Sequence, residues 1–200
     1  MPSAVVIAGG RSTRFGDADK ALADVAGAPM IRRVADRLRG PTDELVVNCR
    51  PGQRAALAEA LAGYDAPVRF AVDDGPDRGP VAGIRNGLAA ASEPVAVVVA
   101  CDMPFVDPAF VATLFDRVEG HDAAVPRLGE WYEPTQAAYR CEPTVDACEA
   151  ALAAGDPRVL DPLEALAWTV VEDVPDEETF RDVDTRAELA AAADDLSERE

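Results

Sequence analysis

Short, continuous apolar runs recur through the first hundred residues, and they constrain the fold more than any other feature. They lie at residues 4–8, 44–48, 68–72 and 94–100. Continuous rather than alternating apolar runs are typical of strands that are covered on both faces. Helical patterns separate them, at residues 30–39, 53–62 and 81–91. This alternation predicts an α/β protein with a doubly wound, Rossmann-like, mostly parallel sheet and helices on both faces.

The pattern becomes looser after residue 100. Asp107 is placed to cap a helix that runs to about residue 118, and either Asp184 or Thr185 is placed to cap a final helix that runs to about residue 196. Between them the sequence predicts strands at 122–126, 131–139 and 168–172, and helices at 142–154 and 158–167. No internal repeat and no long linker divides the chain. We therefore predict a single domain spanning residues 1–200.

Charge is distributed unevenly along the chain. The net charge is −18, yet residues 1–100 carry 12 acidic and 12 basic residues, so the whole excess lies in residues 101–200. An acidic surface repels nucleic acid and anionic membranes, so we expect neither as a partner. The acidity and the scarcity of lysine indicate a halophilic protein in a salt-rich cytoplasm, where repulsion is screened. Codon bias in a GC-rich genome would explain the missing lysines but not the charge.

The cysteines and the apolar runs indicate a cytoplasmic protein. The four cysteines lack the two-residue spacing of a zinc site or a redox dithiol, and we interpret them as reduced core residues. They are Cys49, Cys101, Cys141 and Cys148. Residues 1–8 do not resemble a signal peptide, and no apolar run reaches the length of a membrane span.

The loop at residues 9–20 follows the first predicted strand. It begins with Gly9 and Gly10, continues with two arginines, and ends at Lys20, the only lysine in the chain. Glycines let a backbone approach a phosphate without a Cβ clash, and the cations add positive charge. The loop therefore predicts polyphosphate binding, although its spacing is neither that of a Walker loop nor that of a dinucleotide fingerprint. The alternative is an ordinary turn with two exposed arginines.

Three further polar positions follow strands, at the edge where ligands bind in open parallel sheets. Asp102 could bind Mg²⁺, which takes one or two carboxylates plus substrate phosphates, or it could cap a turn. Asp73 or Asp74 could accept hydrogen bonds from a base or ribose, could support the metal through water, or could be an acid on a flexible loop. Asn48 could recognise a base or sugar edge, or it could hold the next loop in place.

Other reactive side chains do not suggest a catalytic group. His121 lies beside Asp122 without the cysteine or serine context of a zinc site or a triad. Three aromatic residues in predicted strands could line a ring-shaped substrate, but aromatic residues there more often belong to the core. They are Trp131, Tyr132 and Tyr139.

The glycine loop resembles the signature of nucleotidyltransferases that join a nucleoside monophosphate to a phosphorylated acceptor and release pyrophosphate. The shared positions are Gly9-Gly10, Ser12 or Thr13, Arg14, Phe15-Gly16 and Lys20. Within this group the chain is similar to the molybdenum cofactor guanylyltransferase family over nearly its whole length. The other matching segments are Val47-Asn48, Asp73, 79–84, 101–104, 133–140 and 182–189. The Ala8-Gly9-Gly10 form favours the guanylyl branch over the cytidylyl branch.

The resemblance implies a nucleotide-diphospho-sugar transferase type of fold and a specific reaction. GMP would pass from GTP to molybdenum-bearing molybdopterin, giving molybdopterin guanine dinucleotide and pyrophosphate. Residues 1–105 would bind GTP and Mg²⁺, residues 106–196 would bind the acceptor, and residues 197–200 would be a frayed tail. The implied partners are GTP, a molybdopterin-type acceptor and, transiently, molybdoenzymes or other proteins of cofactor biosynthesis.

The same resemblance implies roles for single residues. Arg14, Lys20 and Asp102 would be catalytic, with Asp102 binding Mg²⁺ and Lys20 contacting the phosphates. The remaining nucleotide contacts would come from Ala8, Gly9, Gly10, Asn48 and Asp73. On this basis we expect Lys20→Ala to reduce turnover far more than it alters stability.

Two departures from the family pattern leave the acceptor open. Asp182 and Asp184 stand where asparagines are common, and Thr135-Gln136 replaces a small apolar pair. The alternative acceptors for the same reaction are cobinamide phosphate, phospholactate and a sugar phosphate. A non-catalytic nucleotide-binding module is the alternative from another class, which the presence of all three catalytic candidates disfavours.

Overall fold

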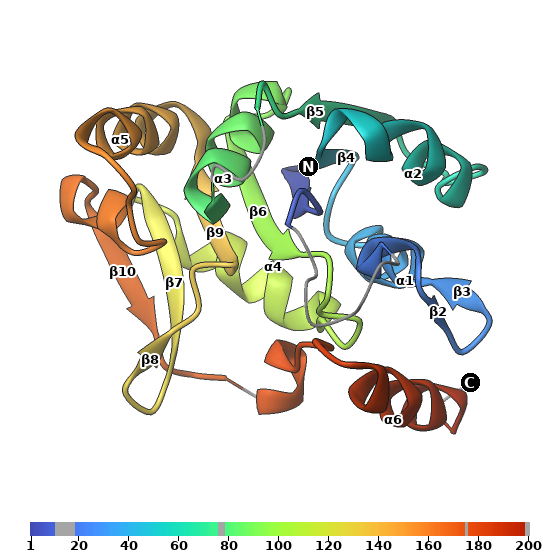
Figure 1. Ribbon diagram of the computed structural model, residues 1–200. Coiled ribbons are helices and arrows are strands. Elements are labelled where there is room, and N and C mark those ends of the chain that lie inside the picture. The colour runs from blue at the N-terminus through green and yellow to red at the C-terminus, as the bar shows by residue number, and fades with distance from the viewer. Residues whose placement is uncertain (11–18, 76–78, 175, 199–200) are drawn as a thin grey trace.

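The computed structural model describes residues 1–10, 19–75, 79–174 and 176–198. Its main strands are β1 (Ser3–Ile7), β4 (Glu44–Cys49), β5 (Val68–Val72), β6 (Val95–Ala100), β7 (Ala123–Leu128), β8 (Trp131–Tyr132), β9 (Gln136–Arg140) and β10 (Trp168–Val171). Its α-helices are α1 (Met30–Leu38), α2 (Arg54–Ala60), α3 (Gly79–Ala90), α4 (Pro108–Arg117), α5 (Cys141–Ala154) and α6 (Arg186–Ser197). These elements assemble around one central sheet (Figure 1).

The sheet has the strand order β10-β7-β9-β6-β1-β4-β5, with β8 paired to β7. The β5-β4-β1-β6 part is entirely parallel, and β9 runs antiparallel to both of its neighbours. The first strand lies between β4 and β6, so the chain builds the sheet to one side of β1 and then returns to the other side. Such a reversal opens a crevice at the carboxyl end of the strands, which is the usual ligand site in this kind of sheet.

Helices cover both faces of the sheet. α1, α2 and α4 pack on one face, where Ile31, Leu57 and Phe110 are buried in one hydrophobic cluster. α3 and α5 pack on the other face, with Ile84 and Cys148 in a second cluster. The doubly wound, mostly parallel architecture predicted from the apolar runs is confirmed.

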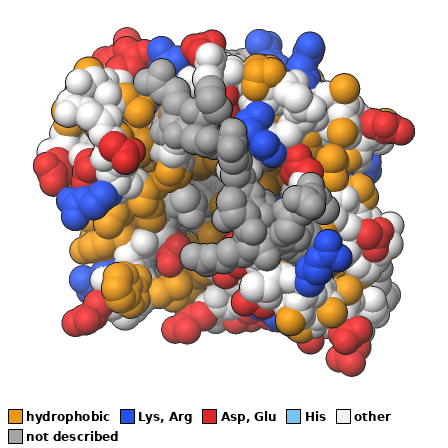
Figure 2. Space-filling view, viewed as in Figure 1, with side chains coloured by type: hydrophobic (Ala, Val, Ile, Leu, Met, Phe, Trp, Pro, Cys, Tyr) orange, Lys and Arg blue, Asp and Glu red, His pale blue; other side chains and the backbone are white. Residues whose placement is uncertain are grey.

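The last helix packs away from both faces. Ala192 and Leu196 of α6 pack against Val25 and Met30, next to the short hairpin of β2 (Asp24–Val25) and β3 (Ala28–Pro29). Figure 1 shows the C-terminal segment passing beneath the sheet to reach this position. In the space-filling view, acidic side chains gather along the same lower rim (Figure 2). Among the described residues, no helix is both long and apolar enough to cross a membrane.

Some predicted elements are corrected by the structure. The single strand expected at 131–139 is two strands, because Pro134 has no N–H for a ladder and the chain turns at residues 133–135 before β9 begins. The helix expected at 158–167 is only a short 3-10 helix, Asp161–Ala165. Thr185 rather than Asp184 caps α6, which extends to Ser197. Of the tail predicted at 197–200, residues 199–200 lie outside the described part.

The cysteine interpretation is also supported. All four cysteines are free thiols; three are buried, and Cys101 is partly buried. The hairpin of β2 and β3 and two further 3-10 helices, Lys20–Leu22 and Glu177–Phe180, were not predicted.

The close packing of α3 on β1 gives a first test of the fold. A Cβ at Gly87 would lie 2.2 Å from Val5 Cγ1, in the buried centre of the sheet. We therefore expect Gly87→Ala to lower the free energy of unfolding by about 1–3 kcal/mol, because overpacking outweighs the better helix propensity of alanine. Gly40→Ala is the control, since a Cβ there meets no atom within 4 Å. Equal denaturation midpoints for the two variants would contradict this packing.

Candidate active site

Lys20 is held at a fixed place beyond the end of β1. It begins a 3-10 helix, Lys20–Leu22, in which Asp19 accepts a hydrogen bond from the N–H of Ala21 at 3.2 Å. Gln53 is buried, and its Nε2 donates both to Asp19 Oδ2 at 2.6 Å and to the carbonyl of Ala8 at 3.0 Å. One amide thus joins the residue after β1 to the residue before Lys20, which fixes where the lysine leaves the loop.

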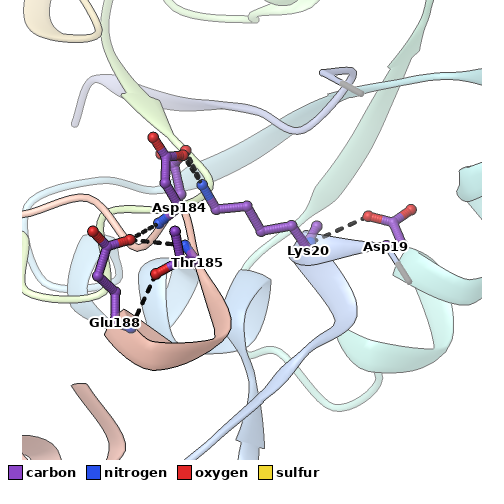
Figure 3. Close-up of polar contacts among 7 residues, drawn as sticks. Asp19, Lys20, Asp184, Thr185 and Glu188 are labelled. Atoms are coloured by element: carbon purple, nitrogen blue, oxygen red, sulfur yellow. Dashed lines mark hydrogen bonds and ion pairs between the residues drawn. The ribbon is translucent and has the colours of Figure 1, made fainter. Parts of the chain in front are cut away.

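The ammonium of Lys20 lies between two carboxylates. Its Nζ donates to Asp102 Oδ2 at 2.8 Å and to Asp184 Oδ1 at 2.5 Å. Lys20 is only 5% exposed, whereas the two aspartates remain partly open to solvent. Figure 3 shows the lysine side chain extended from the end of its loop toward Asp184. The contact between Lys20 and Asp184 joins residues that are 164 positions apart in the sequence.

Backbone hydrogen bonds place Asp184 there. The N–H of Val183 donates to the carbonyl of Asp102 at 2.9 Å, which joins the C-terminal segment to the end of β6. Glu188 Oε2 accepts hydrogen bonds from the N–H groups of Asp184 and Thr185, both at 2.8 Å, and Thr185 caps α6 in return (Figure 3). Asp184 is thus fixed from both sides by a capping box and a strand end.

The lysine remains charged in this environment. Burial alone would lower the pKa of Lys20, but the hydrogen bonds to Asp102 and Asp184 outweigh it, so the pKa lies above its ordinary value of 10.5. A protonated Lys20 is therefore available at neutral pH to interact with phosphate oxygens.

A second polar cluster lies on the other side of β1. Asn48 Nδ2 donates to Asp73 Oδ1 at 2.6 Å and to the carbonyl of Ala71 at 3.1 Å, and Asn86 Nδ2 donates to the same Asp73 oxygen at 3.0 Å. A Cβ at Gly9 would lie 2.6 Å from Asp73 Oδ2. A side chain at position 9 would therefore displace Asp73 from its present position, whatever glycine does for a ligand.

The structure brings the predicted residues together in two groups around β1. Lys20 meets Asp102 on the β6 side, and Gly9 meets Asn48 and Asp73 on the β4 side. Ala8 is part of the framework, because its N–H donates to the carbonyl of Asn48 and its own carbonyl accepts from Gln53. Gly10 is exposed with open space around it, and Arg14 lies outside the described residues.

Asp73, rather than Asp74, makes the hydrogen bonds in the described part of this loop. The three aromatic residues considered in the sequence differ in their burial. Tyr139 is buried in the core, and Tyr132 packs edge-on to Trp168 at 5.3 Å between ring centroids. Trp131 is 76% exposed.

Three site residues were missed at the sequence level. Asp184 could have been found from Thr185-x-x-Glu188, a capping-box pattern that fixes the residue before it. Gln53 and Asn86 gave no signal, because each is a single polar residue within a helical pattern. Their importance depends on partners that are distant in the sequence.

Two more acidic residues lie near the site, Asp182 beside the lysine and Glu133 beside Asp182. Burial raises the pKa of Glu133, and the charge of Asp182 raises it further. The pKa of Asp182 is itself raised by burial and then by the charges of Asp184 and Asp102. Negative charge is therefore concentrated where residues 133 and 182 approach the site.

Comparison with known proteins gives a consistent result. Residues 4–178 match the model of the MobA-like NTP transferase domain. A probable molybdenum cofactor guanylyltransferase of Natronomonas pharaonis is 51% identical over 198 residues, covering 96% of this chain and 97% of that protein. One of Haloferax mediterranei is 42% identical over 168 residues, covering 84% and 79%. Both relatives are haloarchaeal, which is consistent with the halophilic composition predicted above.

A solved structure agrees with the fold. Molybdopterin-guanine dinucleotide biosynthesis protein A from Archaeoglobus fulgidus superposes with a TM-score of 0.80 at 27% identity, covering 98% of this chain and 99% of that chain. The predicted nucleotidyltransferase type of fold is therefore confirmed.

The raised pKa of Glu133 predicts a pH-dependent stability. A carboxylate whose folded-state pKa is raised destabilises the fold once it is ionised, so Glu133→Gln should be more stable than the wild type at pH 7. The gain should decrease as the pH falls through the raised pKa and be absent below about 4.5, the ordinary value. Urea denaturation at pH 7 and pH 4 measures it. A gain of the same size at both pH values would show that the charge of Glu133 is not its cause.

Proposed function

Because the chain belongs to the MobA-like NTP transferase family, we propose that it transfers GMP from GTP to molybdenum-bearing molybdopterin, forming molybdopterin guanine dinucleotide and pyrophosphate. The observation that carries this proposal is the meeting of Lys20, Asp102 and Asp184 at the crevice beside β1. A buried ammonium beside two carboxylates at the end of a glycine loop suits a metal-assisted reaction of phosphate groups.

The two carboxylates fit a divalent cation. Asp102 and Asp184 both direct an oxygen at the same positive charge, which Lys20 supplies in this structure. Mg²⁺ prefers oxygen ligands and usually takes one or two carboxylates plus substrate phosphates. We infer that Asp102 and Asp184 would hold Mg²⁺, which when bound would neutralise charge on the reacting phosphates.

The reaction requires positioning more than reactive side chains. A terminal phosphate oxygen of the acceptor would attack the α-phosphorus of GTP in line, forming one P–O bond while the bond to the bridging α–β oxygen breaks. The leaving group is pyrophosphate, and no covalent enzyme intermediate is needed. Lys20 would neutralise the phosphates, Arg14 would add to that charge, and Gly9 and Gly10 would allow close approach of the backbone.

The two halves of the chain would divide the substrates. Residues 1–105 would bind GTP and Mg²⁺ through Ala8, Gly9, Gly10, Lys20, Asn48, Asp73 and Asp102, and residues 106–196 would bind the acceptor. Asp184 modifies this division, since it belongs to the second half and contacts Lys20 of the first. We also propose a cytoplasmic location, supported by the four free cysteines, and transient contacts with molybdoenzymes or other proteins of cofactor biosynthesis.

The choice of substrates can be tested directly. In high salt with Mg²⁺, we expect pyrophosphate release from GTP with a molybdopterin acceptor, and much less from CTP or ATP. Parallel reactions with cobinamide phosphate, phospholactate and a sugar phosphate test the other acceptors. Release with one of these instead would reassign the acceptor, and tight GTP binding without turnover on any acceptor would indicate a binding module.

Because Lys20 is buried, its replacement should affect both turnover and stability. Lys20→Met should reduce kcat by about 100-fold or more, because one charged group at the reacting phosphates is removed. It should also lower the free energy of unfolding by about 1–3 kcal/mol, since two partly buried carboxylates each lose one hydrogen-bonded cation. The losses of kcat and of stability should both be larger than those of Lys20→Arg, because arginine keeps the positive charge.

Mg²⁺ should recover part of the stability of Lys20→Met, because it can neutralise Asp102 and Asp184 in place of the ammonium. Thermal unfolding with and without Mg²⁺, at constant ionic strength, measures this for both variants. An equal rise in Tm for wild type and Lys20→Met would contradict a shared cation site.

A further inference from the structure

We propose that Asn86 is a positioning residue for nucleoside recognition. Together with Asn48 it holds one oxygen of Asp73, so that the other oxygen faces the glycine loop and accepts a hydrogen bond from the guanosine of GTP. The identity of the ligand rests on the proposed function. The geometry rests on hydrogen bonds among described residues.

Both amide donors converge on the same atom. Asn48 Nδ2 lies 2.6 Å from Asp73 Oδ1, and Asn86 Nδ2 lies 3.0 Å from it. The two asparagines come from β4 and α3, so the carboxylate is held between a strand and a helix that packs on it. Two donors on one oxygen fix the plane of the carboxylate and satisfy that oxygen.

The orientation of the Asn86 amide is itself determined. Its Oδ1 accepts from Arg85 Nη1 at 3.0 Å, and Arg85 Nε donates to Glu149 of α5 at 3.0 Å. If the amide were rotated by 180°, its oxygen would face the carboxylate of Asp73 and its NH₂ would face a guanidinium. Both contacts would be unfavourable, so the Glu149–Arg85 pair keeps the donor of Asn86 on Asp73.

The second oxygen of Asp73 is left for a ligand. Oδ2 lies 2.6 Å from where a Cβ of residue 9 would be, and among the described residues it accepts no hydrogen bond. Asp73 and Asn86 also line a cavity of about 320 Å³ that reaches Arg85 and Glu149. Asp73 is only partly buried, so the clamped residue lies at the surface of the site rather than in the core.

A carboxylate oxygen accepts hydrogen bonds only from donors. Guanosine offers two kinds, the ribose hydroxyls and the N1–H and 2-amino edge of the base. Either would be recognised by Asp73 Oδ2, and an Asp73 that rotates freely would lose part of the interaction. Hydrogen bonds to a charged group contribute about 1.5–3 kcal/mol, which corresponds to roughly 10- to 100-fold in affinity.

Calorimetric titration of the full chain with GTP, in high salt with Mg²⁺, tests the proposal. We expect Asn86→Leu to bind GTP at least about tenfold more weakly, with KM raised and kcat at saturating GTP within about twofold of wild type. Asn86→Ala serves as a second variant if the leucine disturbs folding. The control is Thr113→Val, which removes an exposed helical hydrogen bond far along the chain from Asp73.

A double-mutant cycle separates positioning from general stability. In an Asp73→Ala background, Asn86→Leu should cause no further loss of GTP affinity, because its only proposed route is through that carboxylate. A further tenfold loss in that background would overturn the proposal. So would an unchanged Kd for Asn86→Leu alone. A wild type that binds no GTP would overturn both this inference and the proposed function.

Nucleotide analogues identify the donor. If the ribose is recognised, the penalty of Asn86→Leu should disappear with 2′-deoxy-GTP or 3′-deoxy-GTP and persist with ITP, which lacks the 2-amino group. If the base edge is recognised, the penalty should shrink with ITP and persist with both deoxy analogues. N1-methyl-GTP removes the remaining base donor, N1–H, which ITP keeps. An equal penalty with GTP, both deoxy analogues, ITP and N1-methyl-GTP would overturn the proposal, since Asp73 would then contact neither the ribose nor the base edge.

Discussion

The buried contact of Lys20 with Asp102 and Asp184 is the interaction on which the rest of the site depends. It joins side chains from three segments: the loop after β1, the end of β6 and the segment before α6. An ammonium that is 5% exposed is tolerated only because both carboxylates neutralise it. The same contact holds one oxygen of Asp102 and one of Asp184 within hydrogen-bonding distance of a single point.

The topology explains why the polar residues form two groups instead of one. Because β4 and β6 flank β1 on opposite sides, residues at their carboxyl ends cannot all converge on one point. Asp102 lies on the β6 side with the cation, and Asn48 and Asp73 lie on the β4 side with Gly9. A nucleotide laid across the end of β1 would therefore meet charge neutralisation at one end and hydrogen-bonding recognition at the other.

The sequence predicted the framework well, because continuous apolar strands and their spacing are local signals. The placement of Lys20, Asp102, Asn48 and Asp73 at one edge followed from the rule that parallel strands end together. The side-chain hydrogen bonds that hold these residues in place could not be predicted in the same way. Gln53 and Asn86 act through Asp19 and Asp73, 34 and 13 residues away, and nothing in the local pattern specifies such pairings. The split of residues 131–139 was missed because strand propensity outweighed the single signal of Pro134.

The two aspartates that depart from the family pattern now have different physical consequences. Asp184 is compatible with a phosphate site because its charge is directed at Lys20, so it adds little net negative charge toward a ligand. For Asp182, burial and then the charges of Asp184 and Asp102 raise the pKa and outweigh the opposing effect of Lys20. A phosphorylated acceptor would therefore approach most favourably from the Lys20 side. Of the acidic residues in the second half of the chain, Lys20 offsets Asp102 and Asp184, the two that lie against it.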